Sequence, residues 1–331
     1  MRILVTGAAG FIGSNFVRYW LERHPRDHVV AYDLLTYAGN RSSLDGLDVP
    51  FVQGDIGDAE LAARTLERED IGVIVNFAAE SHNSLAVVDP GRFFRTNVIG
   101  TQTLLEAARN ASVERFHHVS TCEVYGDLTL ESADRFTESS PYRPRTPYNA
   151  SKAGADHAVR AYHETYGLPV TITNCSNNYG AYQFPEKVIP LFVTNALDDE
   201  PLPLYTSTQN KREWLHVLDH CRAIDLVLRE GRVGETYNVG SGVEKTIDEI
   251  ADAVLAALDK PESLKTIVPD RPGHDRRYLL DSTKLRDELG WRDEIPFDRG
   301  LDETAQWYAD SREWWQPLKA RVPVAEASAW K

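Results

Sequence analysis

The chain has 331 residues, 42% of them hydrophobic, and a formal net charge of -14. Its length fits one large domain or two smaller ones around a substantial core, and its acidity argues against broad nucleic-acid binding, which needs clustered Lys and Arg. Three cysteines without CxxC or Cys/His metal spacing argue against a disulfide framework and a metal site, and they favour the cytoplasm. With no apolar run of about 18 residues and no signal-peptide cleavage pattern, no membrane span is predicted.

Short apolar runs alternate with amphipathic stretches of helical length along the first half of the chain. Strands are predicted at residues 2–7, 28–33, 50–55, 73–79, 115–121 and 169–175. Helices are predicted at residues 11–24, 60–69, 97–111 and 150–167. Because crossover helices join parallel strands in this order, we expect a doubly wound, Rossmann-like α/β fold.

The pattern loosens after about residue 175, where four prolines lie between 185 and 203. We expect residues 1–175 to form the Rossmann domain, with part of 212–235 returning to it. Residues 176–331 should form mainly a smaller α/β lobe, and the tail at 323–331 should be frayed because it has little periodicity.

A glycine-rich turn follows the first predicted strand and opens the first helix. Gly7, Gly10 and Gly13 form a GxxGxxG pattern, in which missing β-carbons let a pyrophosphate approach backbone amides at the positive end of a helix. Asp33 ends the second strand, where a carboxylate can bind a ribose diol and repel a 2′-phosphate. The pattern therefore predicts NAD rather than NADP, with the GDI stretch at 54–56 suited to an adenine contact.

Tyr148 and Lys152 lie four residues apart in a predicted helix and therefore share one face. A phenol, with a reference pKa of about 10, is a poor base at neutral pH. An ammonium group one turn away, together with the positive nicotinamide, would favour phenolate and let Tyr148 take a proton from a substrate hydroxyl. Lys152 can also hold the nicotinamide ribose. Without the glycine loop, YxxxK would indicate only a solvated helix face.

These features, with Thr121 at the end of the fifth strand, resemble the extended short-chain dehydrogenase/reductases. More narrowly, the chain resembles nucleotide-sugar dehydratases of the dTDP-glucose 4,6-dehydratase type from Met1 to about Lys319. The segments that carry this resemblance are AAESH, NVIGTQTLLEAA, EVYG, SPYRPRTPYNASKAGAD, NCSNNYGAYQFPEKVIPLF, REWLHVLDHCRAI, YNVGSG and RPGHDRRYLLD.

The resemblance implies a tightly held NAD that is reduced and reoxidised in one turnover. Tyr148 would take the C4 hydroxyl proton of the sugar as hydride leaves C4, with Thr121 bonding the same oxygen. Glu123 would then remove the C5 proton, water would leave C6, and hydride would return to C6. The product would be a 4-keto-6-deoxy sugar nucleotide.

The resemblance also implies contacts with each ligand and a homodimer formed through the helices around 95–110 and 148–166. The implied catalytic residues are Thr121, Cys122, Glu123, Tyr148 and Lys152. The implied cofactor contacts are Gly7, Gly10, Phe11, Ile12, Gly13, Asp33, Asp55, Ile56, Ala78, Ala79, Asn97, Tyr148, Lys152, Cys175 and Asn178. The implied contacts with a nucleotide-diphosphate hexose are Ser81, Asn177, Glu186, Lys187, Arg212, Asn238 and His274. Ordinary structural roles stay open for single positions: Lys187 could be a surface lysine, and His274 could be satisfied by Asp275.

Three departures from the family pattern affect the prediction. Cys122 stands where the family has an aspartic acid that protonates the departing hydroxyl. The segment at 81–90 lacks the usual VDRS after SH, and the segment at 204–214 lacks the usual GDG after LY. The first departure concerns the chemistry, and the other two concern the fit of the substrate.

The role of Cys122 stays open on sequence grounds. Next to Glu123 its ionisation should be opposed, which leaves a neutral and weak acid. Glu123 could perform both proton transfers in a syn elimination, or Cys122 could be a small buried residue in an enzyme that eliminates water slowly. A nucleophilic role is disfavoured because neither His117 nor His118 is placed to assist.

Three other functions compete with the 4,6-dehydratase. A 5,6-dehydratase would return hydride to C4 and give a 5,6-ene, and the altered acid and the altered 81–90 segment motivate it. A 4-epimerase would need Tyr148 but not Glu123. A non-catalytic NAD-binding scaffold would need none of Thr121, Tyr148 and Lys152, so their presence argues against it.

Overall fold

The computed structural model describes residues 1–270 and 273–321 of the chain. The strands are β1 (Arg2–Thr6), β2 (His28–Asp33), β3 (Phe51–Gln53), β4 (Val73–Asn76), β5 (Arg115–Thr121), β6 (Val170–Cys175), β7 (Asn177–Tyr179), β8 (Leu202–Tyr205), β9 (Lys211–His216), β10 (Thr236–Val239), β11 (Glu244–Thr246) and β12 (Lys265–Val268). The helices are α1 (Phe11–Arg23), η1 (Arg41–Leu44), α2 (Ala59–Arg68), α3 (Asn83–Val88), α4 (Pro90–Phe93), η2 (Phe94–Gly100), α5 (Thr101–Asn110), η3 (Cys122–Tyr125), α6 (Pro147–Tyr166), α7 (Val188–Leu197), α8 (Val217–Glu230), α9 (Ile247–Ala257), η4 (Glu262–Leu264), α10 (Thr283–Leu289), α11 (Phe297–Asp310) and α12 (Arg312–Lys319). The predicted tail at 323–331 and the first two residues of RPGHDRRY lie outside the described residues.

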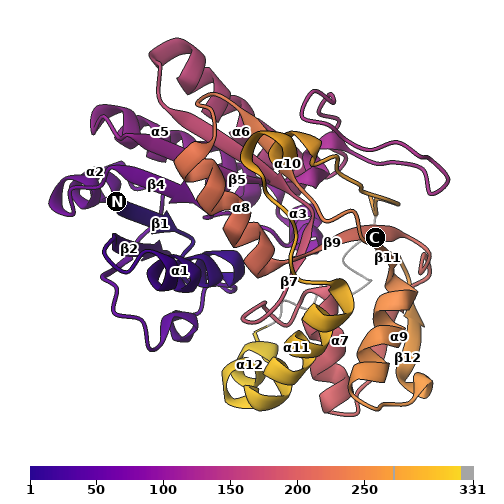
Figure 1. The fold of residues 1–331 in the computed structure, drawn as a ribbon. Coiled ribbons are helices and arrows are strands. Elements are labelled where there is room, and N and C mark those ends of the chain that lie inside the picture. The colour runs from indigo at the N-terminus through magenta and orange to yellow at the C-terminus, as the bar shows by residue number, and fades with distance from the viewer. Residues whose placement is uncertain (271–272, 322–331) are drawn as a thin grey trace.

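Within the described ranges, seven parallel strands form one sheet in the order β10-β6-β5-β4-β1-β2-β3 (Figure 1). The chain runs outward from β1 to β3 and then crosses to β4 on the other side of β1. This reversal creates a crevice at the carboxyl ends of β1 and β4, where doubly wound sheets bind ligands. The predicted doubly wound fold is confirmed, and all six predicted strands are present.

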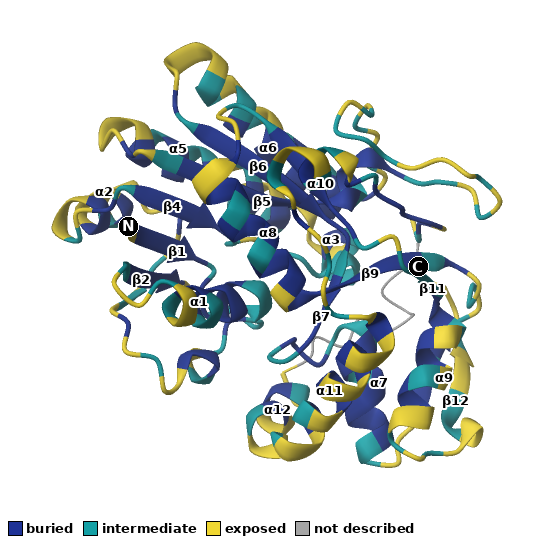
Figure 2. Cartoon of the chain, in the orientation of Figure 1, coloured by how far each residue is buried: buried dark blue, intermediate teal, exposed yellow. Residues whose placement is uncertain are grey.

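Helices cover both faces of the large sheet, and the strands between them are buried (Figure 2). One face packs against α1 and α8, and the other packs against α2, α5 and α6. Parallel strands that are covered on both faces become continuous apolar runs, and for this reason they were recognisable in the sequence.

A second group of elements packs around its own core below the sheet in Figure 1. Helices α7, α9, α11 and α12 share one hydrophobic cluster with β8 and β9. In the described part of the chain, β11, β9 and β7 form a three-stranded sheet, and β12 pairs with β8. The division into two lobes at about residue 175 stays a prediction, because α8 and β10 from the second half belong to the large sheet and its cover.

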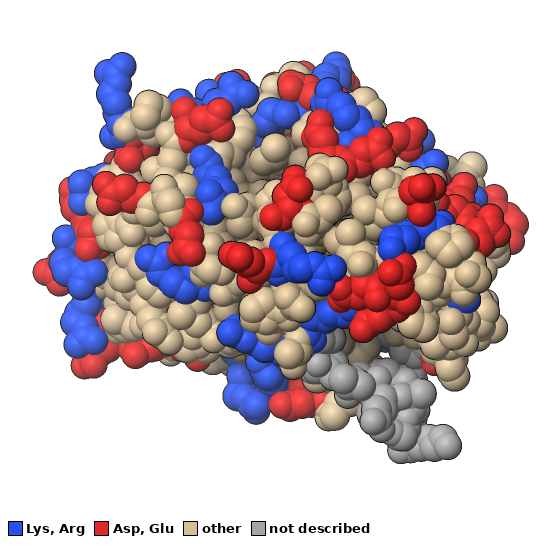
Figure 3. Space-filling model, turned by 90° about the horizontal axis from the view of Figure 1, so that it is seen from below, with Lys and Arg blue, Asp and Glu red and all other residues tan. Residues whose placement is uncertain are grey.

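Acidic and basic side chains are interspersed over the face shown in Figure 3. Neither sign forms a continuous area there, although the chain as a whole is acidic. Over the described residues, the structure contains no helix that is both long and apolar enough to cross a membrane.

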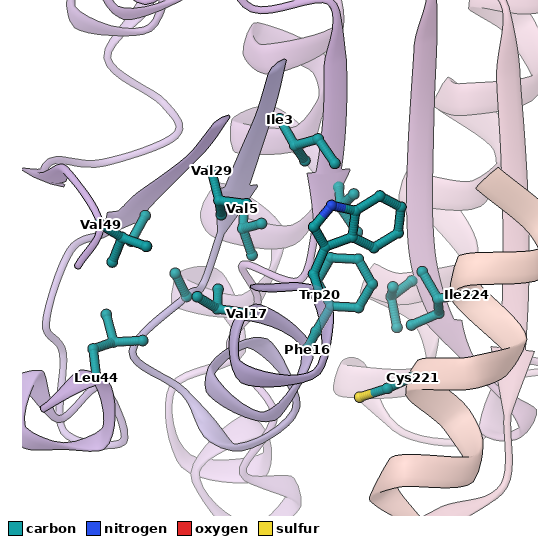
Figure 4. Close-up of a cluster of buried hydrophobic side chains, with 14 of the residues drawn as sticks. Ile3, Val5, Phe16, Val17, Trp20, Val29, Leu44, Val49, Cys221 and Ile224 are labelled. Carbon is teal, nitrogen blue, oxygen red and sulfur yellow. The ribbon is translucent and has the colours of Figure 1, made fainter. Parts of the chain in front are cut away.

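The packing of α8 on α1 explains how a late segment joins the first domain. Phe16 and Trp20 of α1 lie in one buried cluster with Cys221 and Ile224 of α8 (Figure 4). Helix α8 lies within the 212–235 segment that we expect to return to the Rossmann domain, and this domain division stays a prediction. The contact also places β10, which follows α8, at the edge of the sheet beside β6.

The helix predicted at 97–111 differs from the observed structure at its first turn. Residues 94–100 form the π-helical segment η2, and the α-helix α5 begins only at Thr101. π-helical turns are uncommon and often occur near functional sites. Here the turn includes Thr96, which lines the cavity described below, and Asn97, which bonds the backbone of Glu80.

Candidate active site

The largest concentration of predicted site residues lies in one cavity at the carboxyl ends of the parallel strands. The chain reaches it from the turns that follow β1, β2, β3, β4, β5 and β6, and from the start of α6. The predicted residues that line it are Gly7, Gly10, Phe11, Ile12, Gly13, Asp33, Asp55, Ile56, Ala78, Ala79, Ser81, Thr121, Cys122, Glu123, Tyr148, Lys152, Cys175, Asn177, Asn178, Glu186 and Lys187.

The start of α1 forms one wall of the cavity and can bind an anion. Gly10 is the N-cap of α1, no side chain caps this end, and the first turn contains no acidic residue. The first amides of a helix have no intrahelical acceptor, and the helix dipole adds positive partial charge there. Gly7 has φ +65°, and a β-carbon on it would lie 2.7 Å from the backbone nitrogen of Ala78. This turn therefore fits the pyrophosphate of a dinucleotide.

Asp33 lies beside the glycine loop at the end of β2. Its Oδ2 accepts a hydrogen bond from the amide of Ala9 over 2.9 Å, and its Oδ1 accepts one from the amide of Leu35 over 2.7 Å. Burial raises the pKa of Asp33, while these two N–H groups act in the opposite direction. Its carboxylate therefore orders the loop as well as lining the cavity.

Tyr148 and Lys152 share the inner face of α6, which begins at the N-cap Thr146. Lys152 Nζ donates to the carbonyl of Val119 over 2.8 Å and lies 3.3 Å from His118 Nε2. Burial raises the pKa of Tyr148 well above its usual value, the Glu123 charge adds to this effect, and a hydrogen bond with Thr121 opposes it. The protein alone therefore favours the phenol, and the expected phenolate, which required the positive nicotinamide as well as Lys152, stays a prediction.

Cys122 and Glu123 follow β5 in the short helix η3. Cys122 is buried in an apolar cluster with residues that include Tyr278 and Leu280. Burial raises the pKa of its thiol well above the ordinary value, and the neighbouring Glu123 charge adds to this effect. The expected opposition to thiol ionisation is therefore present, and Cys122 is a neutral SH group.

Two of the predicted residues lie outside the cavity, with their side-chain amides hydrogen-bonded to the protein. The Asn97 side chain accepts a hydrogen bond from the amide of Glu80, and it donates to the Glu80 carbonyl and to the Ser151 hydroxyl. Asn238 is completely buried, accepts from the Tyr125 hydroxyl and donates to the Phe136 carbonyl. The structure thus places Asn97 one residue from the cavity wall and Asn238 in the protein interior, and both positions fit supporting roles.

Arg212 and His274 also lie outside this cavity. Arg212 is buried and donates to three carbonyls, including that of Asp275, while its guanidinium lies 4.8 Å from the Tyr278 ring centre. His274 lies against Tyr205, with its Nδ1 3.2 Å from Ser207 Oγ. Arg212 therefore anchors residues 275–276 of the RPGHDRRY segment, and His274 lies beside β8.

Glu186 and Lys187 join the cavity to two flanking segments. Glu186 forms an ion pair with Lys187 over 3.3 Å, lies 3.3 Å from His82 Nε2, and accepts a hydrogen bond from Tyr37 over 3.1 Å. Lys187 Nζ donates to the carbonyl of Ser81 over 2.9 Å. The cation of Lys187 is thus held at the cavity wall and is not a free surface lysine.

Three cavity or supporting residues were not recognised in the sequence. Glu80 lines the cavity and forms an ion pair with Arg92. Asn83 also lines it and donates a hydrogen bond to Glu123. His118 contacts the Lys152 ammonium group through Nε2. Glu80 and Asn83 lie in the segment that leaves β4 and enters α3, so their place after a strand at the switch point was a usable signal. His118 could not be found in this way, because its contact depends on how α6 packs on β5.

The comparisons with known proteins agree with this geometry. The sequence profile of the GDP-mannose 4,6 dehydratase family matches residues 4–304. The chain belongs to this family. A curated relative named dTDP-glucose 4,6-dehydratase, from Xanthomonas campestris, is 51% identical over 95% of this chain and 94% of its own length. A relative of the same name from Streptomyces niveus is 48% identical over 97% and 96%. The predicted resemblance to nucleotide-sugar dehydratases is thereby confirmed.

Solved structures of related enzymes have the same fold. A dTDP-glucose 4,6-dehydratase from Streptomyces venezuelae, solved with NAD bound, is 52% identical with a TM-score of 0.93, covering 96% of this chain and all of that chain. A UDP-glucose 4-epimerase from Thermus thermophilus, also solved with NAD, is 32% identical with a TM-score of 0.87, covering 94% and 100%. Dehydratases and epimerases thus share this scaffold, and side chains in the site must distinguish them.

Proposed function

We propose that the chain is an NAD-dependent hydro-lyase that converts dTDP-glucose, or a close nucleotide hexose, into a 4-keto-6-deoxy sugar nucleotide. The observation that carries the proposal is the meeting of Thr121, Glu123, Tyr148 and Lys152 in one cavity. The uncapped start of α1 opens into the same cavity and supports NAD binding there. The names of the relatives at about half identity support the same activity.

Each catalytic residue has a role that its position supports. NAD, when bound, supplies the hydride acceptor and donor. Tyr148, bonded to Thr121, takes the proton of the sugar C4 hydroxyl. Lys152 holds the cofactor ribose and adds positive charge beside the phenol. Glu123 removes the proton from C5, which the C4 ketone has made acidic.

The C6 hydroxyl must be protonated as it leaves, and Cys122 is poorly suited to this step. Its thiol is neutral but a weaker acid than a carboxyl group, and it lies among apolar side chains. We propose that Glu123 passes the proton taken from C5 to the departing hydroxyl, so that one carboxylate serves as base and then acid. Atoms balance in this syn elimination, because the proton leaves with the hydroxide as water.

Two of the departures from the family pattern favour a second candidate, a 5,6-dehydratase that returns hydride to C4. Cys122 stands in place of the family acid, and the altered segment at 81–90 places Asn83 against Glu123. A 4-epimerase has no use for a carboxylate at the C5 side of the sugar, so the position of Glu123 in the cavity disfavours it.

Incubation with dTDP-glucose, UDP-glucose and UDP-N-acetylglucosamine in parallel tests the proposal. Mass spectrometry and NMR of the products should show loss of water, a C4 ketone and a C6 methyl group with dTDP-glucose. A terminal alkene would support the second candidate, and an unchanged mass with an inverted C4 would indicate an epimerase.

We also infer a homodimer in the cytoplasm. Phe94 and Ile99 of η2 and Tyr166 of α6 are large hydrophobic residues that remain exposed, and η2 packs on α6. A second copy of this surface would cover them, and the molecular mass in solution tests the dimer. The three cysteines are free thiols, which fits a reducing compartment.

A further inference from the structure

Asn83 links the two elements that carry the catalytic residues. It is the first residue of α3 and lines the cavity. Its Nδ2 donates a hydrogen bond to Glu123 Oε2 over 3.3 Å, and its Oδ1 accepts one from the Thr146 hydroxyl over 3.4 Å. Thr146 lies two residues before Tyr148. The side-chain amide of Asn83 therefore connects the segment after β5 to the start of α6.

Thr146 supplies a donor for the oxygen of the Asn83 amide. As the N-cap of α6, Thr146 Oγ1 accepts the amide hydrogen of Asn149 over 3.2 Å. Its one hydroxyl proton is then available to donate to Asn83 Oδ1. The NH₂ group of Asn83 points to the Glu123 carboxylate, which only accepts hydrogen bonds when it is ionised, and the Asn83 oxygen accepts from Thr146.

Four weak acids interact with the charge of Glu123. Cys122 lies beside it in η3, Tyr148 lies in α6, Cys175 ends β6, and Tyr278 lies in the segment between β12 and α10. Burial raises the pKa of each of them and the negative charge of Glu123 adds to this effect, so each stays protonated beside it. A carboxylate that accepts an N–H donor is favoured in its charged form.

We propose that Asn83 is a positioning residue that keeps Glu123 ionised and rotated for removal of the sugar C5 proton. In that step the C5–H bond breaks, an O–H bond forms on Glu123, and the electron pair passes into the enolate of the C4 ketone. The inference rests on the dehydratase function proposed above. It gives a specific task to the segment at 81–90, in which this chain departs from the family pattern.

Asn83→Leu and Asn83→Asp in the NAD-loaded enzyme test the role. Leu removes both hydrogen bonds at similar volume, whereas Asp keeps the shape and the bond from Thr146 but sets a second carboxylate beside Glu123. In single turnovers with dTDP-glucose, NADH formation should stay within about two-fold of wild type, while water loss slows by about 10- to 100-fold. Ser84→Ala, on the next residue of α3, is the matched control and should change neither rate.

The pH profile separates this role from general damage to the fold. The acid limb of the pH–rate profile for water loss should move to higher pH by about 0.5 to 1 unit in Asn83→Leu, and further in Asn83→Asp. Both substitutions make the charged form of Glu123 less favoured. An unmoved limb, or an equal fall of NADH formation and water loss, would overturn the role of Asn83. A wild-type enzyme that forms NADH without losing water would contradict the proposed function itself, and the role of Asn83 with it.

Discussion

Cys122 stands where the sequence resemblance led us to expect an aspartic acid. The side chain is almost completely buried, and its neighbours in the cluster include Ala153 and Leu280. A neutral thiol in such surroundings packs as a small apolar group and gives up its proton reluctantly. In the mechanism proposed above, Glu123 therefore performs both proton transfers.

Cys122→Asp should raise the rate of water loss, because general acid catalysis is typically worth about 100- to 10,000-fold and burial would keep the new carboxyl protonated. It should also lower the free energy of unfolding by about 1 to 3 kcal/mol, since a polar group replaces an apolar one in the cluster. Product NMR against time measures the rate, and urea unfolding measures the stability.

Cys122→Ser is the matched control for this substitution. It supplies a hydroxyl of similar size without the acidity of a carboxyl group, so it should not raise the rate. If Cys122→Asp instead slows water loss while NADH formation is unchanged, the thiol itself is required and our account of the step is wrong.

Sequence motifs predicted the residues of the cavity that lie at strand ends, including Asp33 and Thr121, and Tyr148 at the start of α6. They did not predict the environment of residues whose partners are distant in the chain. Asn238 bonds Tyr125, which is 113 residues away, and this pairing leaves its amide inside the protein. Such contacts depend on the packing of whole elements, which local spacing does not contain.

Helix α6 positions Tyr148 and Lys152, and it also carries Asp156, the acid whose charge favours the protonated form of Lys152. Asp156 lies one turn after Lys152 on the same helix and is fully buried. It accepts hydrogen bonds from Ser120 and Tyr142, and its Oδ1 lies 3.5 Å from His118 Nε2, the imidazole that contacts Lys152. Burial lowers the pKa of Lys152, and the Asp156 charge opposes this effect.

Asp156→Asn should therefore move the alkaline limb of NADH formation to lower pH by about 1 unit, because Lys152 would lose its proton more easily. Stopped-flow absorbance across a pH series measures the limb. Asp225→Asn in α8, which removes a buried acid paired with Arg229 outside the cavity, should leave the limb in place. A limb that moves equally in both variants would show that lost stability, not the charge on Lys152, is the cause.

At the scale of elements, the six predicted strands were confirmed because apolar runs report burial on both faces. The sequence did not predict β10, which joins the sheet only because α8 packs on α1 and brings the chain back. It also missed the π-helical turn at 94–100, since an extra residue in a turn leaves little trace in hydrophobic periodicity.

At the scale of the whole molecule, one buried acid connects three segments from the second half of the chain by hydrogen bonds. Glu213 of β9 is fully buried, and its carboxyl oxygens accept the amides of Gly242 over 2.7 Å and Leu280 over 2.9 Å. Burial raises the pKa of Glu213 to about 7, although these hydrogen bonds act against the rise.

The sign of the pH effect follows from this raised pKa. Between about pH 4.5 and 7 the folded protein holds a proton on Glu213 that the unfolded chain has released, so this contribution to the free energy of unfolding decreases as pH rises. Glu213→Gln cannot titrate. The stability of wild type minus that of the variant should therefore be larger at pH 5 than at pH 8, by about 1 to 3 kcal/mol. Urea unfolding at both pH values measures it, and a difference that grows with pH would contradict the assignment.

The central claim, that hydride leaves C4 and returns to C6, is tested most directly with dTDP-glucose labelled with deuterium at C4. NMR of the product formed by the wild-type enzyme should place the deuterium in the C6 methyl group of a 4-keto-6-deoxy sugar. Deuterium found at C4 of a 5,6-unsaturated sugar, or at an inverted C4 without loss of water, would contradict the account.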